Sequence, residues 1–245
     1  VRWVVGIVLG AYIGTIVLLN IPNIQQAMSV FVAEELSEVL NTKVVIGRIN
    51  MGLLNRIIID DVLLDDQSGQ EMLKVTRLSA KFDIMPFFKG KISISSVQLF
   101  GFNINLRKET PDSPPNFKFV LDAFASKDTV KKENSLDLRI NSILIRRGRM
   151  SYHVLSEEET PGKFNAKHIQ LQNIIANISL KALSKDSLNL GIKRLSLDEK
   201  ASGFSLKKMS LKLVANNKQT NIDNFTIELP ETSLKLDTIH LEYDS

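Results

Sequence analysis

One spacing of apolar residues recurs along this 245-residue sequence and constrains its fold more than any other feature. The motif is apolar-x-apolar-x-x-apolar-x-apolar, in which two alternating pairs are separated by two further residues. Its six occurrences are Ile92, Ile94, Val97 and Leu99; Leu138, Ile140, Ile143 and Ile145; Phe164, Ala166, Ile169 and Leu171; Leu190, Ile192, Leu195 and Leu197; Phe204, Leu206, Met209 and Leu211; and Leu234, Leu236, Ile239 and Leu241. Because alternation with a period of two is typical of strands, the sequence beyond Lys43 predicts a β protein.

The two residues in the middle of the motif decide the shape of each strand. In a regular strand, the extra residue places the second apolar pair on the opposite face of the sheet. A β-bulge or bend that absorbs this residue returns all four side chains to one face. The repetition therefore predicts one sheet that is bent along a shared line and carries a nearly continuous apolar face.

The sequence offers too few helices to cover that face. Beyond the N-terminal region, only residues 117–125, which follow a Pro-containing loop, predict a short helix. A β-sandwich or closed barrel, in which the sheet covers itself, is one solution. The other, which we expect, is an all-β repeat groove. It is an open, bent sheet preceded by an N-terminal transmembrane helix and a short amphipathic helix.

The N-terminus predicts the membrane helix. Residues 3–19 carry no charge, and a helix extended to Ile21 nearly spans a hydrocarbon core of ~30 Å. We expect a transmembrane anchor in residues 1–21, with Arg2 in the cytoplasm and the chain beyond Pro22 across the membrane. Its candidate lipid-facing residues are Trp3, Val8, Leu9, Ile13, Val17 and Leu18. A cleaved signal peptide is the alternative, although no small-x-small cleavage site follows.

Four further segments complete the expected organisation. Residues 22–42 predict an amphipathic helix at the membrane surface that packs onto the next domain. Its expected apolar residues are Ile24, Met28, Phe31, Val32, Leu36, Val39 and Leu40. Residues 43–110 form a first β-groove module, 111–134 a Pro-containing linker with a short helix, and 135–245 a second β-groove module.

Chemistry-bearing motifs are scarce. The sequence has no Cys and no GxSxG, GxxxxGK[ST], GxGxxG or HExxH motif. His153, His168 and His240 have no second His or carboxylate at metal-ligand spacing, so we expect no catalytic residue, metal or cofactor, and no enzyme. Residues 65–69 (DDQSG) predict a turn rather than a cation loop, because the alternating ligands of such a loop are missing. The net charge of +4 is spread out and aromatic content is 7%, which disfavours nucleic-acid binding.

Several segments in order resemble the N-terminal part of TamB proteins, in the AsmA-like family of bridge-like lipid transfer proteins. They are residues 42–49 (TKVVIGRI), 57–66 (IIIDDVLLDD), 78–83 (LSAKFD) and 90–101 (GKISISSVQLFG), after the apolar N-terminus and the Ile-Pro step. The resemblance implies a single-pass protein of the bacterial inner membrane with its bulk in the periplasm. It also implies a BamA-like (TamA-like) outer-membrane barrel as partner, although the C-terminal region that meets this barrel has no counterpart in the sequence.

The resemblance further implies passage of membrane phospholipid along an apolar β-groove. The candidate lining residues are Ile92, Ile94, Val97, Leu99, Leu138, Ile140, Ile143, Ile145, Leu190, Ile192, Leu195, Leu234 and Leu236. Ordinary sheet core is the plainer role for the same residues. The alternative function is a scaffold or chaperone that supports outer-membrane protein assembly by strand-edge pairing.

Overall fold

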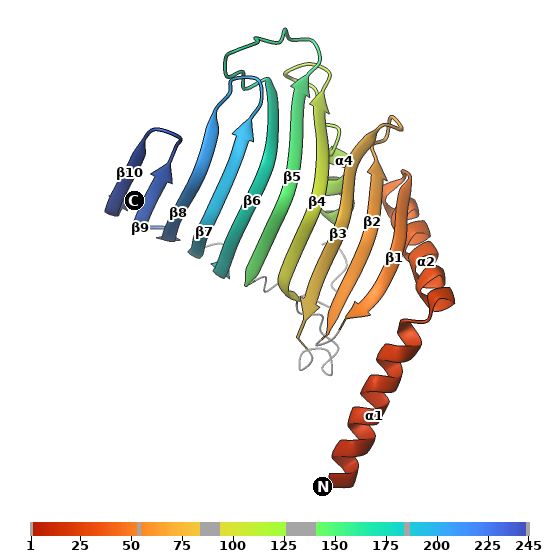
Figure 1. Ribbon diagram of the computed structural model, residues 1–245. Helices are drawn as coiled ribbons and strands as arrows, with labels where there is room; N and C mark the ends of the chain where they lie inside the picture. The colour runs from red at the N-terminus through yellow and green to blue at the C-terminus, as the bar shows by residue number, and fades with distance from the viewer. Residues whose placement is uncertain (1, 53–54, 84–93, 126–140, 184–186, 244–245) are drawn as a thin grey trace.

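Ten strands form a single sheet in which each strand lies beside its neighbours in the sequence (Figure 1). The computed structural model describes residues 2–52, 55–83, 94–125, 141–183 and 187–243. The strands are β1 Val44–Gly52, β2 Arg56–Asp65, β3 Glu71–Phe82, β4 Ile94–Lys108, β5 Ser142–Val154, β6 His168–Leu183, β7 Ser187–Glu199, β8 Ser205–Asn216, β9 Gln219–Glu228 and β10 Ser233–Glu242. The sheet is open, with β1 and β10 at its two edges, and is not closed into a barrel.

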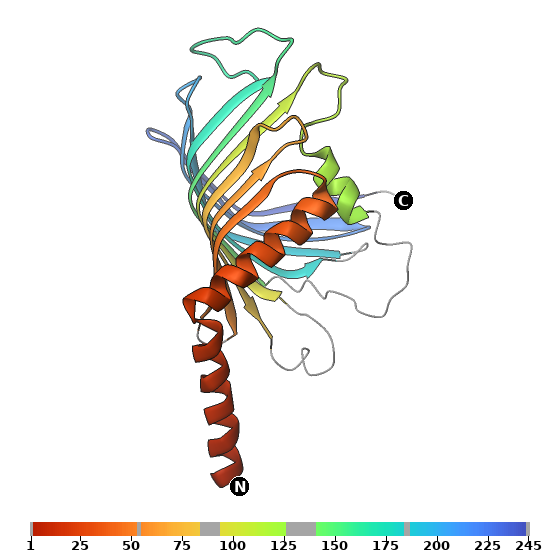
Figure 2. The same ribbon diagram turned by 90° about the vertical axis from the view of Figure 1, so that its right-hand side faces the viewer.

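Three helices of the described residues accompany the sheet. They are α1 (Arg2–Leu19), α2 (Pro22–Leu40) and α4 (Lys118–Ala125), the last of which matches the short helix expected from the sequence. Figure 2 shows α1 projecting away from the sheet, while α2 and α4 lie on its concave side. Pro22 stands in the first turn of α2, where its missing N–H costs nothing. Asn41, in the left-handed conformation with φ 48°, ends this helix.

All neighbouring strands are antiparallel except β4 and β5, which are parallel. A parallel pair needs a crossover that returns the chain along the strand length. The described part of the connection between β4 and β5 includes α4, which lies on the concave side (Figure 2). The two groove modules therefore contribute to one continuous sheet, and their boundary stays a prediction.

Four strand residues with a left-handed φ of 54–64° follow one line across β2 to β6: Asp61, Gly101, Arg147 and Asn173. Asn224 of β9 also has a left-handed φ (52°) but lies off this line. Asp61 and Gly101 lie at equivalent positions, because Val62 and Asp60 pair with Val75 and Arg77, which in turn pair with Phe102 and Phe100. The sheet is concave (Figure 2), but the expected position of the bend is right only in part. Register shifts fall in the middle of the motif in β4 (between Ile94 and Ser96) and in β7 (between Ile192 and Leu195), whereas Gly101 and Arg147 lie beyond their motifs.

Strand register also confirms that motif residues share one face. Val97 pairs with Ile143, and Leu195 pairs with both Ala176 and Met209. Two of the six motif assignments were partly wrong, however. Phe164 and Ala166 lie in the loop before β6, and Phe204 lies in the turn before β8. A β-turn closes each of these connections, so Phe164 and Phe204 are exposed to solvent. Ile92, Leu138 and Ile140 lie outside the described residues.

The face of α2 that packs on the sheet agrees only in part with the expected one. Its buried residues are Gln25, Ser29, Ala33 and Leu40, with Met28, Val32 and Leu36 packed beside them. Phe31 and Val39 point away, and Phe31 is 63% exposed. Small residues at Ser29 and Ala33 permit a close approach to β1, which a stripe centred on Phe31 does not.

The expected single membrane span is not supported. In the described part of the chain, no individual helix is both long enough and apolar enough to cross a bilayer. Residues Gly10–Leu19 and Pro22–Leu40 satisfy these criteria only together, as a pair bent by 69°. The bend arises because Ile21 is extended (ψ 130°) and Pro22 starts a new helix.

Candidate functional site

The candidate site is the concave face of the sheet, called here the inner face. One row of paired residues crosses it completely and takes one apolar side chain from each strand. In strand order, the row is Ile49, Ile59, Leu78, Leu99, Ile145, Ala176, Leu195, Met209, Ile227 and Leu234. An apolar surface therefore runs without a polar interruption in this row from β1 to β10.

The structure brings the described lining candidates together on this face. Leu99, Ile145, Leu195 and Leu234 belong to the complete row. Ile94, Val97, Ile143, Ile192, Leu190 and Leu236 lie on the same face in neighbouring rows. Every lining candidate within the described residues is therefore on the inner face.

Residues 43–110 were expected to form strands, but no residue of the first three strands was among the lining candidates. The same spacing is present in β1 (Val44, Ile46, Ile49, Met51), in β2 (Ile57, Ile59, Val62, Leu64) and in β3 (Leu73, Val75, Leu78, Ala80). These residues form the inner face at the N-terminal end of the sheet. The signal was in the sequence, but Asp60 and Asp61 in the middle of β2 resemble a loop more than a strand.

Among the described residues, helices cover the inner face at its β1 end. Side chains of α2 and α4 pack with β1–β3 in one apolar cluster, where Ile46, Ile49 and Met72 are buried. A second cluster around Val75, Phe102 and Ile174 continues it toward the middle of the sheet. On β10, by contrast, Leu234 is 48% and Leu236 39% exposed. The apolar surface thus becomes more accessible away from α2.

The outer face is polar along the bend. Asp60 accepts two hydrogen bonds from Arg77, at 2.6 Å from Nε and 3.2 Å from Nη2. These hydrogen bonds and the negative charge of Asp60 raise the pKa of Arg77 above its ordinary value. Arg147 lies over the ring of Phe100, with 5.2 Å between its Cζ and the ring centroid. The outer face is therefore suited to contact with water, and the inner face to contact with apolar groups.

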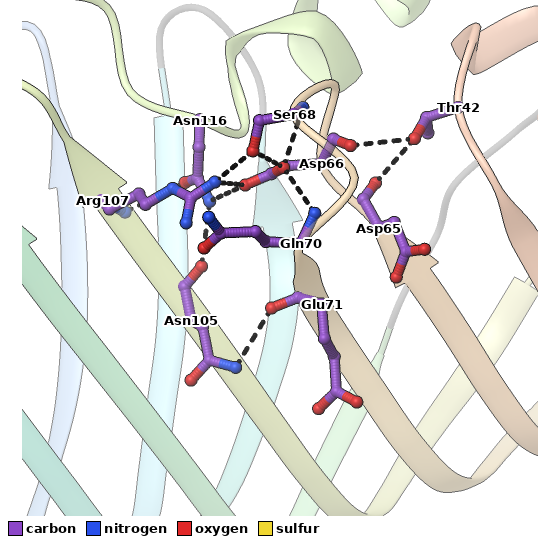
Figure 3. Close-up of polar contacts among 9 residues, drawn as sticks. All are labelled: Thr42, Asp65, Asp66, Ser68, Gln70, Glu71, Asn105, Arg107 and Asn116. Carbon is purple, nitrogen blue, oxygen red and sulfur yellow. Dashed lines mark hydrogen bonds and ion pairs between the residues drawn. The ribbon is translucent and has the colours of Figure 1, made fainter.

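A buried polar cluster locks the covered end, and Figure 3 shows its contacts. Oδ1 of Asp66 accepts hydrogen bonds from the backbone N–H groups of Ser68 (2.9 Å) and Gln70 (3.1 Å) and from the Ser68 hydroxyl (2.6 Å). Oδ2 accepts from Arg107 (2.6 Å) and from Asn116 (3.2 Å). The expected turn at residues 65–69 is confirmed, and its carboxylate is fully engaged by protein donors.

The cluster joins the elements that cover the inner face. Asn116, in the segment that leads to α4, donates from Nδ2 to the Asn105 carbonyl of β4 at 3.0 Å. Thr42, which follows α2, donates to the carbonyls of Asp65 and Asp66 at 3.1 Å each. Burial raises the pKa of Asp66, but hydrogen bonds from Ser68, Asn116 and Gln70 outweigh it, so the pKa lies below its ordinary value.

A chain of amides fixes the corner between α1 and the sheet. Nδ2 of Asn20 donates to the Met51 carbonyl at 2.8 Å. Nε2 of Gln25 donates to Oδ1 of Asn50 at 2.7 Å, and Nδ2 of Asn50 donates to Asp60 at 3.3 Å. This contact sets α1 at the β1 end of the inner face.

Comparison with known proteins assigns no family. No protein-family model matches the sequence, and no curated protein is significantly similar to it. The molecule is thus defined by its architecture, an open single-sheet β protein with a continuous apolar inner face.

Proposed function

We propose that this protein carries phospholipid acyl chains along the inner face, from the inner membrane toward the outer membrane, as the resemblance to TamB proteins implies. The observation that supports it best is the complete apolar row from Ile49 to Leu234, one residue per strand. A soluble β domain buries such a face beneath a second layer, whereas in the described part of the chain α2 and α4 pack on its first strands.

The energetics of this surface favour sliding over release. Burial of each methylene contributes about 0.8 kcal/mol, so an acyl chain of about sixteen carbons gains roughly 10 kcal/mol relative to water. Escape into solvent is therefore slow. Movement from one strand to the next exchanges one apolar lining for another, and the net free-energy change of each step is small.

The N-terminal helices support attachment of the sheet to a bilayer. In α1, the side chains of Trp3, Ile13, Val17 and Leu18 are exposed, and Trp3 is 87% exposed. Such a surface has a natural partner in lipid. We propose that α1 inserts into the inner membrane, with α2 at its surface, so that the inner face begins where lipid is available.

A scaffold for outer-membrane protein assembly is the second candidate, and the β10 edge favours it. β10 pairs with β9 on one side and forms the edge of the sheet on the other. An uncovered edge strand accepts an added strand from a partner.

Site-specific photo-crosslinking in cells separates the two functions. A photoreactive residue at Leu195, in the complete row, is expected to give phospholipid adducts. The matched control is Lys212, whose exposed side chain lies on the outer face of β8. Equal lipid labelling at both positions contradicts lipid conduction. Labelling of nascent outer-membrane proteins at β10, without lipid at Leu195, supports the scaffold.

A further inference from the structure

Three side chains that suit a metal ion meet at the end of β5 and the start of β6. His153 and His168 are paired in the register of these strands, and Glu159 comes from the loop between them. One ligand atom of each lies within 4.8 Å of the other two. Sequence spacing missed this set, because the histidines are 15 residues apart and only strand pairing brings them together.

These residues lie away from the proposed lipid surface. Tyr152 and Ile169, next to the two histidines, pair with each other and, through Leu106, continue the inner face. Because successive side chains of a strand alternate, His153 and His168 belong to the outer face. A metal ion bound by these residues therefore lies on the opposite face of the sheet from the proposed acyl chains.

A backbone carbonyl selects the tautomer of the neutral His168 ring. Its Nε2 lies 2.9 Å from the carbonyl oxygen of Glu157, which only accepts hydrogen bonds, so Nε2 carries the hydrogen. The lone pair is then on Nδ1. His168 is buried, with 7% exposure, so its orientation is held by packing as well. A ring N–H donated to a backbone carbonyl is the usual support of a metal-binding histidine.

The distances match a tetrahedral ion. Nδ1 of His153 lies 3.1 Å from Nδ1 of His168 and 3.7 Å from Oε1 of Glu159. Ligands at about 2.0–2.1 Å from Zn²⁺ stand roughly 3.3 Å apart in a tetrahedron. The Glu159 side chain is 63% exposed, so a small rotation that completes the set meets little resistance.

We propose that His153, His168 and Glu159 bind one Zn²⁺ ion. Two imidazoles and one carboxylate suit Zn²⁺ and disfavour Mg²⁺ and Ca²⁺, which prefer oxygen ligands alone. Three protein ligands leave a fourth position open. Glu159 and His168 also line a cavity together with Thr160, Gln170 and Lys200, which leaves room for a further ligand. The ion fastens the loop of residues 155–167 to the ends of two strands.

Isothermal titration of the full chain in detergent, after treatment with a chelator and its removal, tests this site. ZnCl₂ is expected to bind with one ion per chain, and MgCl₂ to give no saturable binding. His168→Ala and His153→Ala are each expected to weaken Zn²⁺ binding more than about tenfold. Glu159→Gln, which changes an exposed side chain and preserves the fold, is expected to weaken it about tenfold.

The matched control is His240→Ala. His240 also lies beside a carboxylate, with Nε2 3.1 Å from Oε1 of Glu242, but it belongs to β10. Its removal is expected to leave the affinity unchanged. Equal Zn²⁺ affinity of the wild type and of both His153→Ala and Glu159→Gln overturns the proposal, as does the absence of saturable Zn²⁺ binding to the wild type.

Discussion

Arg107 and Asp66 form a buried ion pair in which Nη2 lies 2.6 Å from Oδ2, although the two residues belong to different hairpins. The side chain of Asp66 is 3% exposed and that of Arg107 is 19% exposed. Removal of one partner leaves the other charge buried. Arg107→Met is therefore expected to lower the free energy of unfolding by about 3–5 kcal/mol in urea denaturation. Lys118→Met removes the exposed pair with Asp122 and, as control, is expected to cost less than about 1 kcal/mol.

Stability is expected to fall in acid because of two turn carboxylates. Burial raises the pKa of Glu199, as it does that of Asp66, but hydrogen bonds from Ser202, Gln170 and Ala201 outweigh it and lower the pKa. A carboxyl with a lower pKa in the folded state stabilises the protein above its ordinary pKa. This contribution is lost as the pH falls through the folded-state value.

The midpoint temperature of thermal unfolding is measured from neutral pH down to the pH at which the protein no longer folds. The wild type is expected to lose stability below the ordinary carboxyl range, and Asp66→Asn to show a shallower loss from a lower starting value. Glu231→Gln, at an exposed position, is the control and keeps the wild-type profile. An unchanged slope in Asp66→Asn refutes the assignment.

Gly148 provides a test of the bend. A Cβ at this position stands 2.4 Å from the Phe102 ring and 3.0 Å from Cβ of Ile174, both of them buried. Gly148→Ala is expected to destabilise the protein by about 1–3 kcal/mol. Gly162→Ala, in open space with a φ of 77°, adds backbone strain alone and is expected to cost about 1 kcal/mol. Denaturation midpoints that are equal in the two variants contradict a close-packed bend.

The two ends of the inner face are expected to respond differently to charge. Val75 is 4% exposed, so Val75→Asp is expected to destabilise the fold by roughly 4 kcal/mol or more. Leu236 is uncovered, so Leu236→Asp is expected to change stability by less than about 1 kcal/mol while reducing lipid crosslinking at Leu195. Urea denaturation combined with crosslinking measures both effects. If Leu236→Asp unfolds the protein, the face at β10 is ordinary core.

The spacing of apolar residues predicted much of the sheet, because both strand alternation and the extra residue of a bulge depend only on residues that are close in the sequence. The motif at Leu234, Leu236, Ile239 and Leu241 is one example. Pairing between distant residues was not predictable in this way. Neither the parallel β4–β5 pair nor the meeting of His153 with His168 leaves a local signal, since each depends on where the chain returns. For α2, the packing of Met28, Val32, Leu36 and Leu40 was expected, but Ser29 was missed and Phe31 wrongly included, because close approach to β1 favours small residues over large apolar ones.

The line of bulges has a consequence for how such a protein lengthens. Curvature accompanies irregular positions within individual strands, at residues such as Asp61, Gly101 and Arg147. An added hairpin with the same spacing therefore extends the channel by about 4.8 Å per strand without altering its cross-section. The width and the length of the inner face can therefore change separately in this architecture. Duplication of hairpins would lengthen the sheet while the proposed lipid continues to contact a surface of the same cross-section.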